Sequence, residues 1–180
     1  MNTETRSLEI QQQEFAKRKF LAMPFAGIVM WTIVGIGGLF LPPQYETWLL
    51  FICTGFIAYL GMYISKFTGE NFLDKKKPKN TFDNLFFFAM GEALLVYSIA
   101  IPFFMTDYTS LPLTVGILTG LMWLPFSWIV QHWVGLFHGI FRTLLVVTLW
   151  YILPDLRFVA IPFAIVFVYI ITIVILLKRA

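Results

Sequence analysis

Two histidines, a glutamine and an arginine interrupt a long apolar stretch in the second half of the chain. Residues 131–145 read QHWVGLFHGIFRTLL and lie between runs of Leu, Val, Ile and Phe. On a helix that turns about 100° per residue, His138 and Arg142 are about 40° apart, and Gln131 lies within about 20° of both. His132 projects about 120° away from His138, so the two histidines do not converge as metal ligands. The pattern predicts a polar stripe that holds no metal and no cofactor.

Arg142 is the residue of this stripe that costs most to bury. It lies about nine residues, or roughly 14 Å, into a predicted membrane span. A charged side chain at that depth costs about 2.5–3.5 kcal/mol, so the guanidinium needs a polar partner. Glu92 lies about eight residues into another predicted span that runs in the same direction, and no other acid is expected to be well buried. We therefore predict that Glu92 and Arg142 lie in contact or share one polar cavity, with His138 adjacent.

The same residues also allow a structural interpretation. Gly135 and Gly139 flank the stripe, and Gly116 and Gly120 lie on the preceding predicted span. Small residues at this spacing allow helices to pack closely in a membrane, and a buried Glu–Arg pair could then simply set the packing of the helices. The sequence leaves open whether Glu92, Gln131, His138 and Arg142 line a binding site, serve packing, or extend toward the bilayer surface.

The composition shows which medium surrounds these residues. Hydrophobic residues make up 59% of the 180 residues and charged residues only 13%, whereas soluble domains are usually about 45–50% apolar and 25% charged. The basic residues cluster beside apolar segments, which is not the pattern of a nucleic-acid-binding surface. A single cysteine, Cys53, excludes an internal disulfide. The chain is therefore predicted to be an integral membrane protein that does not bind nucleic acid.

The predicted fold is an all-α, polytopic transmembrane bundle of six spans with a short amino-terminal interfacial helix. Residues 1–19 form the interfacial segment, in which Glu14 and Arg18 are spaced to pair along a helix, and residues 20–178 form the membrane domain. Each span needs about 20 apolar residues to cross the hydrocarbon core. The six segments that meet this requirement lie near 20–41, 48–67, 84–105, 111–129, 133–153 and 156–177.

Lysine and arginine predict the orientation of the bundle, because cytoplasmic loops are enriched in both residues. With six spans, eleven of these residues fall on one side: Arg6, Lys17, Arg18, Lys19, Lys66, Lys75, Lys76, Lys77, Lys79, Lys178 and Arg179. Arg157 is the one basic residue in the opposite connections. Both termini are therefore predicted to be cytoplasmic. The loop that carries Lys75, Lys76, Lys77 and Lys79 could also attract anionic lipid headgroups.

Three short motifs resemble an uncharacterised family of small bacterial multi-span membrane proteins, known as a domain of unknown function. They are MPFAGIVMW (23–31), ISKFTGENF (64–72) and LPFSW (124–128), and the similarity extends from about Phe20 to the end of the fourth span. The resemblance implies a bacterial inner (cytoplasmic) membrane and supports the count of six spans. It assigns no chemistry to His138 or Arg142.

Three classes of function remain open at this stage. The polar residues favour a small-solute carrier or channel-like protein with its site between the third and fifth spans, and Arg142 suits a carboxylate-bearing or other anionic cargo. The glycine pairs suit a non-catalytic scaffold protein, including a homo-oligomer that associates through GILTG or GLFHG. The least favoured class is a membrane-embedded enzyme that acts on a lipid-like substrate with His138 as general base, since no catalytic motif is present.

Overall fold

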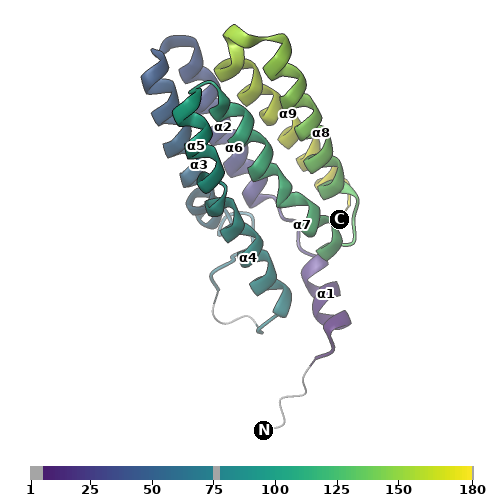
Figure 1. Ribbon diagram of the computed structural model, residues 1–180. Helices are drawn as coiled ribbons and strands as arrows, with labels where there is room; N and C mark the ends of the chain where they lie inside the picture. The colour runs from purple at the N-terminus through teal and green to yellow at the C-terminus, as the bar shows by residue number, and fades with distance from the viewer. Residues whose placement is uncertain (1–5, 75–77, 180) are drawn as a thin grey trace.

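The computed structural model describes residues 6–74 and 78–179, and every regular element in these ranges is helical (Figure 1). The all-α prediction is confirmed. The elements are α1 (Leu8–Ala16), α2 (Ala22–Phe40), α3 (Pro43–Ile64), α4 (Thr81–Leu95), α5 (Tyr97–Thr106), α6 (Ser110–Leu121), α7 (Trp123–Ile129), α8 (Val134–Ile152), the 3-10 turn η1 (Pro154–Leu156) and α9 (Arg157–Lys178).

These helices form six spans that are long and apolar enough to cross a membrane, as predicted. The spans are Ala22–Phe40, Pro43–Ile64, Thr81–Thr106, Ser110–Ile129, Val134–Ile152 and Pro154–Lys178. The second span begins five residues earlier than expected because Pro43 occupies the first helical turn, where its missing N–H is not needed. The third also begins earlier, because the side chain of Asn80 caps α4 by accepting a hydrogen bond from the Phe82 N–H at 2.9 Å.

Two of the spans are interrupted near their middle. The third consists of α4 and α5, which meet at Val96, and the fourth consists of α6 and α7, which meet at Met122. Pro125 explains the second break, because proline has no N–H for the carbonyl of Leu121 and its ring crowds that carbonyl. α6 accordingly ends at Leu121. Both breaks lie beside one cavity, which Tyr97 and Met122 help to line.

α1 and the last turn of α9 lie at the same end of the bundle, together with the described residues of the connection between α3 and α4 (Figure 1). We call this the basic end, defined by α1, the described residues of 65–80, and residues 178–179. Arg157 begins α9 at the opposite end. Lys75, Lys76 and Lys77 lie outside the described residues. This arrangement is the one that an even number of spans requires.

A cluster of phenylalanines attaches α1 to the membrane domain. Phe15 is fully buried, and its ring lies 4.7 Å from that of Phe20 and 6.0 Å from that of Phe86. Arg18, just beyond α1, forms an ion pair with Asp83 of α4. The predicted Glu14–Arg18 pair is wrong: α1 ends at Ala16, before it could place Arg18 beside Glu14, and Glu14 pairs with Arg6 instead.

Glu70 caps the first membrane span from a distant part of the sequence. This side chain is buried, and its Oε1 accepts hydrogen bonds from the backbone N–H groups of Leu21 at 2.6 Å and Ala22 at 3.2 Å. A carboxylate at this position satisfies unpaired amides at the start of α2 and complements the helix dipole. The expectation that only Glu92 would be a well-buried acid was therefore wrong.

Candidate functional site

Arg142 and His138 lie one turn apart on α8 and are both fully buried, each with 0% of its surface exposed. α8 packs against α6 on one side and α9 on the other. Gly120 of α6 makes room for the arginine, since a Cβ at this position would lie 3.1 Å from Arg142 Cδ. The site is thus formed inside the bundle by side chains of the first, fourth, fifth and sixth spans.

The guanidinium of Arg142 is held by neutral groups among the residues that the structure describes. Nη2 donates to Thr119 Oγ1 at 2.8 Å, and Nη1 donates to Tyr169 Oη at 3.3 Å. The guanidinium carbon also lies 5.5 Å from the centre of the Trp31 ring and 5.6 Å from that of Tyr169. At such distances aromatic rings attract a cation, and the attraction is stronger away from water. The buried charge is therefore stabilised without a described carboxylate.

His138 continues the same hydrogen-bond network, and the network indicates its tautomer. Thr172 Oγ1 donates its proton to the carbonyl of Val168 at 2.8 Å, so it can accept one from His138 Nδ1, also at 2.8 Å. The other ring nitrogen, Nε2, lies 3.4 Å from Arg142 Nη1, which can only donate. The arrangement therefore assigns a neutral His138 with its proton on Nδ1. Trp123 stacks on the ring at a centroid distance of 4.2 Å.

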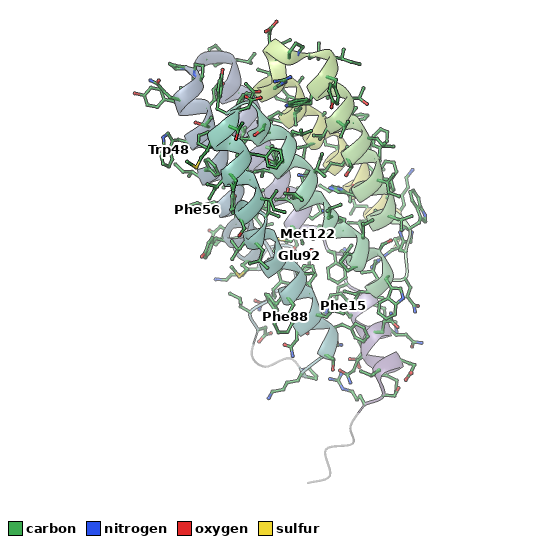
Figure 2. All side chains as sticks on the ribbon, in the orientation of Figure 1. Phe15, Trp48, Phe56, Phe88, Glu92 and Met122 are labelled. Atoms are coloured by element: carbon green, nitrogen blue, oxygen red, sulfur yellow. The ribbon has the colours of Figure 1, made fainter. Side chains whose placement is uncertain are left out.

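The predicted pairing of Glu92 with Arg142 is wrong. Glu92 lies on α4 (Figure 2) and its side chain is exposed, whereas Arg142 is fully buried. The ion pairs between described residues are Arg6–Glu14 and Arg18–Asp83. Equal depth in two parallel spans sets the height of a side chain but not the direction in which it points around the helix. The polar site consequently does not lie between the third and fifth spans.

Gln131 is also separate from the buried cluster. It precedes α8 with a φ of 50°, in the left-handed region, and its exposed side chain donates to Gln12 Oε1 at 3.3 Å. The helical projection that placed it beside His138 was extended past the start of the helix. His132 lies in the same connection, where partial burial, and then the positive charge of Arg179, lower the pKa of its imidazole.

The four glycines singled out from the sequence lie where helices of this chain meet. A Cβ at Gly116 would lie 3.3 Å from Ile165, and one at Gly139 would lie 3.1 Å from Leu124. Gly135 is the most constrained, because a Cβ there would lie 2.2 Å from the carbonyl oxygen of Trp123. These faces are already covered by helices of the same chain, so they do not offer a free surface for dimerisation.

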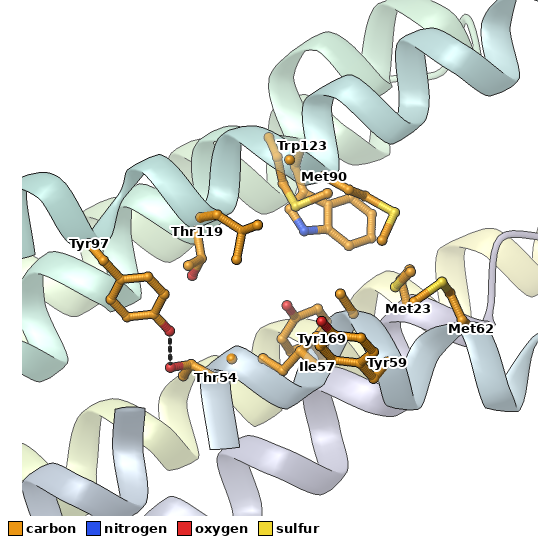
Figure 3. A pocket seen from close by; sticks show the side chains of 15 residues that line it. Met23, Thr54, Ile57, Tyr59, Met62, Met90, Tyr97, Thr119, Trp123 and Tyr169 are labelled. Carbon is orange, nitrogen blue, oxygen red and sulfur yellow. Dashed lines mark hydrogen bonds between the residues drawn. The ribbon is translucent and has the colours of Figure 1, made fainter. Parts of the chain in front are cut away.

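A cavity of about 240 Å³ adjoins the polar cluster in the half of the bundle nearer the basic end (Figure 3). Four methionines, one from each of the first four spans, contribute to its wall: Met23, Met62, Met90 and Met122. Its volume is more than ten times the roughly 10–15 Å³ that one water needs on this measure. The methionines make the wall apolar and adaptable, since their side chains are flexible and polarisable.

The cavity lies beside both interrupted spans and is bounded at one end by a hydrogen bond. Tyr97, the first residue of α5, lies 2.7 Å through its hydroxyl from Thr54 Oγ1 of α3, and this bond closes the cavity toward the middle of the bundle (Figure 3). Gly55 and Gly91 border open space, because a Cβ at either would meet no atom within 4 Å. The exposed side chain of Tyr59 on α3 forms part of the rim. The cavity therefore opens sideways, between α3 and α4.

Three residues belong to both the cavity wall and the polar cluster. Thr119 and Tyr169, the hydroxyl partners of Arg142, line the cavity, and so does Trp123, which stacks on His138. Arg142 and His138 themselves lie behind this layer. A molecule in the cavity would thus contact hydroxyl groups that are polarised by a buried cation.

The contacts of the cluster come from Thr119, Tyr169 and Thr172, none of which was predicted from the sequence. A signal for two of them was present, because Tyr169 and Thr172 are three residues apart, on one face of the most apolar span. Polar side chains on one face of such a helix usually point into the protein. No similar periodicity marks Thr119.

Comparison with known families gives one match, which covers residues 8–179. The chain belongs to the DUF7010 family of unknown function. The resemblance seen in the short motifs is confirmed as membership of a family of unknown function, and the match continues through the fifth and sixth spans, beyond the limit predicted from the motifs. No curated protein and no solved structure matches the chain. The protein is thus a polytopic membrane protein whose family assigns no activity.

Proposed function

We propose that this protein binds an amphipathic molecule that comes from the bilayer and occupies the cavity between α3 and α4. The observation that carries the proposal is the arrangement of the wall, which is mainly apolar and includes four methionines, with Thr119 and Tyr169 on the side nearest Arg142. An apolar tail would contact the methionines, and a polar head would accept a hydrogen bond from the Tyr169 hydroxyl, which itself accepts one from Arg142. Ligand sites commonly combine apolar walls with a few convergent polar groups.

The interruptions in two spans support a binding role for the cavity. Irregular backbone in a membrane is tolerated where it lies inside the protein or lines a cavity, and broken spans form the binding sites of many transport proteins. Here the breaks at Val96 and Met122 lie next to the cavity-lining residues Tyr97 and Trp123. A carrier of lipid-like molecules is the form of the carrier hypothesis that fits this arrangement.

The other function classes have less support. Arg142 and His138 have no exposed surface, which does not favour direct binding of a hydrated small solute. His138 uses Nδ1 toward Thr172 and Nε2 toward Arg142, so neither nitrogen is available as a general base. The charge distribution favours a topology with both termini in the cytoplasm, which fusions of a reporter to each terminus would test.

Photolabelling with a diazirine analogue of palmitic acid would test the proposed binding. We expect the probe, added to membranes that contain the full chain, to label Met62 and Met90 and to be displaced by excess unlabelled palmitic acid. Gly55→Leu and Gly91→Leu would place side chains in open space, so the fold should persist while labelling of the cavity falls.

Phe88→Leu is the matched control, because Phe88 lies on the same helix as Gly91 but is 78% exposed. This variant should leave cavity labelling unchanged. If the probe labels only lipid-facing residues, or labels Met62 and Met90 equally in Gly91→Leu and in the unmodified protein, the proposed function is wrong.

A further inference from the structure

A second hollow, at the basic end, is lined by cationic side chains. It has a volume of about 500 Å³ and lies between α1, the connection from α7 to α8, and the end of α9. We call it the basic groove. Its charged or titratable lining residues are Lys17, Arg18, Lys19, His132 and Arg179, and none of the acidic residues that the structure describes lines it.

The positive charge of the basic groove is only partly compensated. Arg18 forms its ion pair with Asp83, but neither Lys17 nor Lys19 takes part in an ion pair within residues 6–74 and 78–179. Both lysine side chains are exposed. Their charges are therefore available to an anion that enters the groove.

Arg179 is held in position beside these lysines. Its Nη2 donates to the backbone carbonyls of Ala16 and Arg18, the latter at 2.8 Å. Its Nη1 is buried and has no hydrogen-bond partner in the described part of the chain. A buried donor without a partner is costly, so a small shift of the guanidinium that exposed Nη1 to an anion oxygen would be favourable.

The groove lies at the ends of the fourth and sixth spans. Val130 and Leu176, which adjoin the ends of the fourth and sixth spans, form its apolar side. Trp128 and Trp133, next to this connection in sequence, are both exposed. Exposed tryptophans at the ends of spans are typical of the membrane–water interface.

We propose that the basic groove binds the phosphate group of an anionic glycerophospholipid, with Lys17, Lys19 and Arg179 as its cationic contacts. The phosphate would lie between α1 and the end of α9, and the acyl chains would follow the apolar side of the groove into the bilayer. Basic pockets at the ends of membrane helices recognise such headgroups. The proposal relies on none of Lys75, Lys76, Lys77 and Lys79, and it does not depend on the cavity between α3 and α4.

Native mass spectrometry of the full chain in detergent would test the site with phosphatidylglycerol, with phosphatidylcholine, and with inorganic phosphate alone. We expect phosphatidylglycerol to remain bound at energies that remove phosphatidylcholine. Lys17→Gln combined with Lys19→Gln should weaken phosphatidylglycerol binding on the order of tenfold or more. Arginine at both positions should preserve it.

The control is Lys66→Gln combined with Lys178→Gln, which removes the same charge from exposed residues that do not line the groove. It should retain phosphatidylglycerol. If both double variants lose phosphatidylglycerol binding equally, the attraction is general electrostatics and the proposed site is wrong. Displacement of the lipid by inorganic phosphate alone would identify a site for soluble anions and overturn the lipid assignment.

Discussion

The hydrogen bond from Arg142 to Thr119 provides a direct test of how the buried charge is stabilised. Thr119→Val keeps the shape of the side chain but removes the acceptor that lies 2.8 Å from Nη2. It leaves a buried, charged donor without a partner, which costs about 1.5–3 kcal/mol when the hydrogen bond involves a charged group. We expect the free energy of unfolding to fall by at least this amount.

The same substitution should cost much less when the arginine is absent. In an Arg142→Met background the Nη2 donor no longer exists, so the loss of the acceptor has no charged partner to affect. Thr119→Val also removes a bond from Oγ1 to the Val115 carbonyl at 2.6 Å, but that loss is common to both backgrounds and cancels in a double-mutant cycle. The coupling energy should therefore be about 1.5–3 kcal/mol.

Unfolding in mixed micelles of a mild detergent and sodium dodecyl sulfate, followed by circular dichroism, would give these free energies. Thr143→Val is the matched control, because Thr143 Oγ1 donates to the Gly139 carbonyl at 2.8 Å in the same way as Thr119 does to Val115. The changes that Thr143→Val and Glu92→Gln cause in the free energy of unfolding should each add to the change caused by Arg142→Met. If Thr119→Val lowers the free energy of unfolding equally in both backgrounds, the proposed stabilisation of Arg142 by Thr119 is wrong. If Glu92→Gln is coupled to Arg142→Met, the ion pair predicted from the sequence is supported instead.

Three further predictions concern other parts of the molecule. Glu70→Ala should lower the free energy of unfolding by about 1–2 kcal/mol because it removes the cap of α2. An unfolding curve in mixed micelles that matches that of the unmodified protein would show that the cap contributes little. Gly135→Ala should cost about 1–3 kcal/mol through overpacking, whereas Gly91→Ala, in open space, should be neutral, and a reversal of this order in thermal unfolding would contradict the packing described. The lowered pKa of His132 beside Arg179 means that the unfolded chain binds a proton more readily, so stability is fully present above the unfolded pKa of about 6.5 and falls as the pH drops below it. His132→Asn should make the unfolding temperature less sensitive to pH in that range. If the unfolding temperature of the variant changes with pH as steeply as before, His132 is not the cause of the pH dependence.

The spans could be predicted from the sequence because apolar length is a local property, read within about 20 residues. The burial of Arg142 and His138 followed from the cost of exposing polar groups to lipid. Their partners could not be predicted, since contacts across helices depend on the direction each helix presents, and depth alone does not give that direction. Glu92 shows this limit: its depth matches that of Arg142, yet its side chain is exposed.

The remaining errors have a different physical origin. Gln131 was placed by a helical repeat that stops at Val134, where α8 begins. Glu70 was overlooked because a glutamate in a polar connection normally faces water, and only the tertiary structure places it against the start of α2. The cavity depends on two helix breaks and two glycines from different spans, a combination that no local pattern describes.

The contacts of α1 have a consequence for the order in which the molecule is assembled. α1 is among the first segments to be synthesised, but Phe82 and Phe86, which pack on Phe15, arrive only with the third span. Arg179, which binds the carbonyls of Ala16 and Arg18, arrives only after the sixth. Because a chain is made from its amino terminus onward, the contact of α1 with Arg179 can form only after all six spans have been synthesised. Its docking therefore marks the completion of the bundle, and a chain that is released early leaves α1 without that contact.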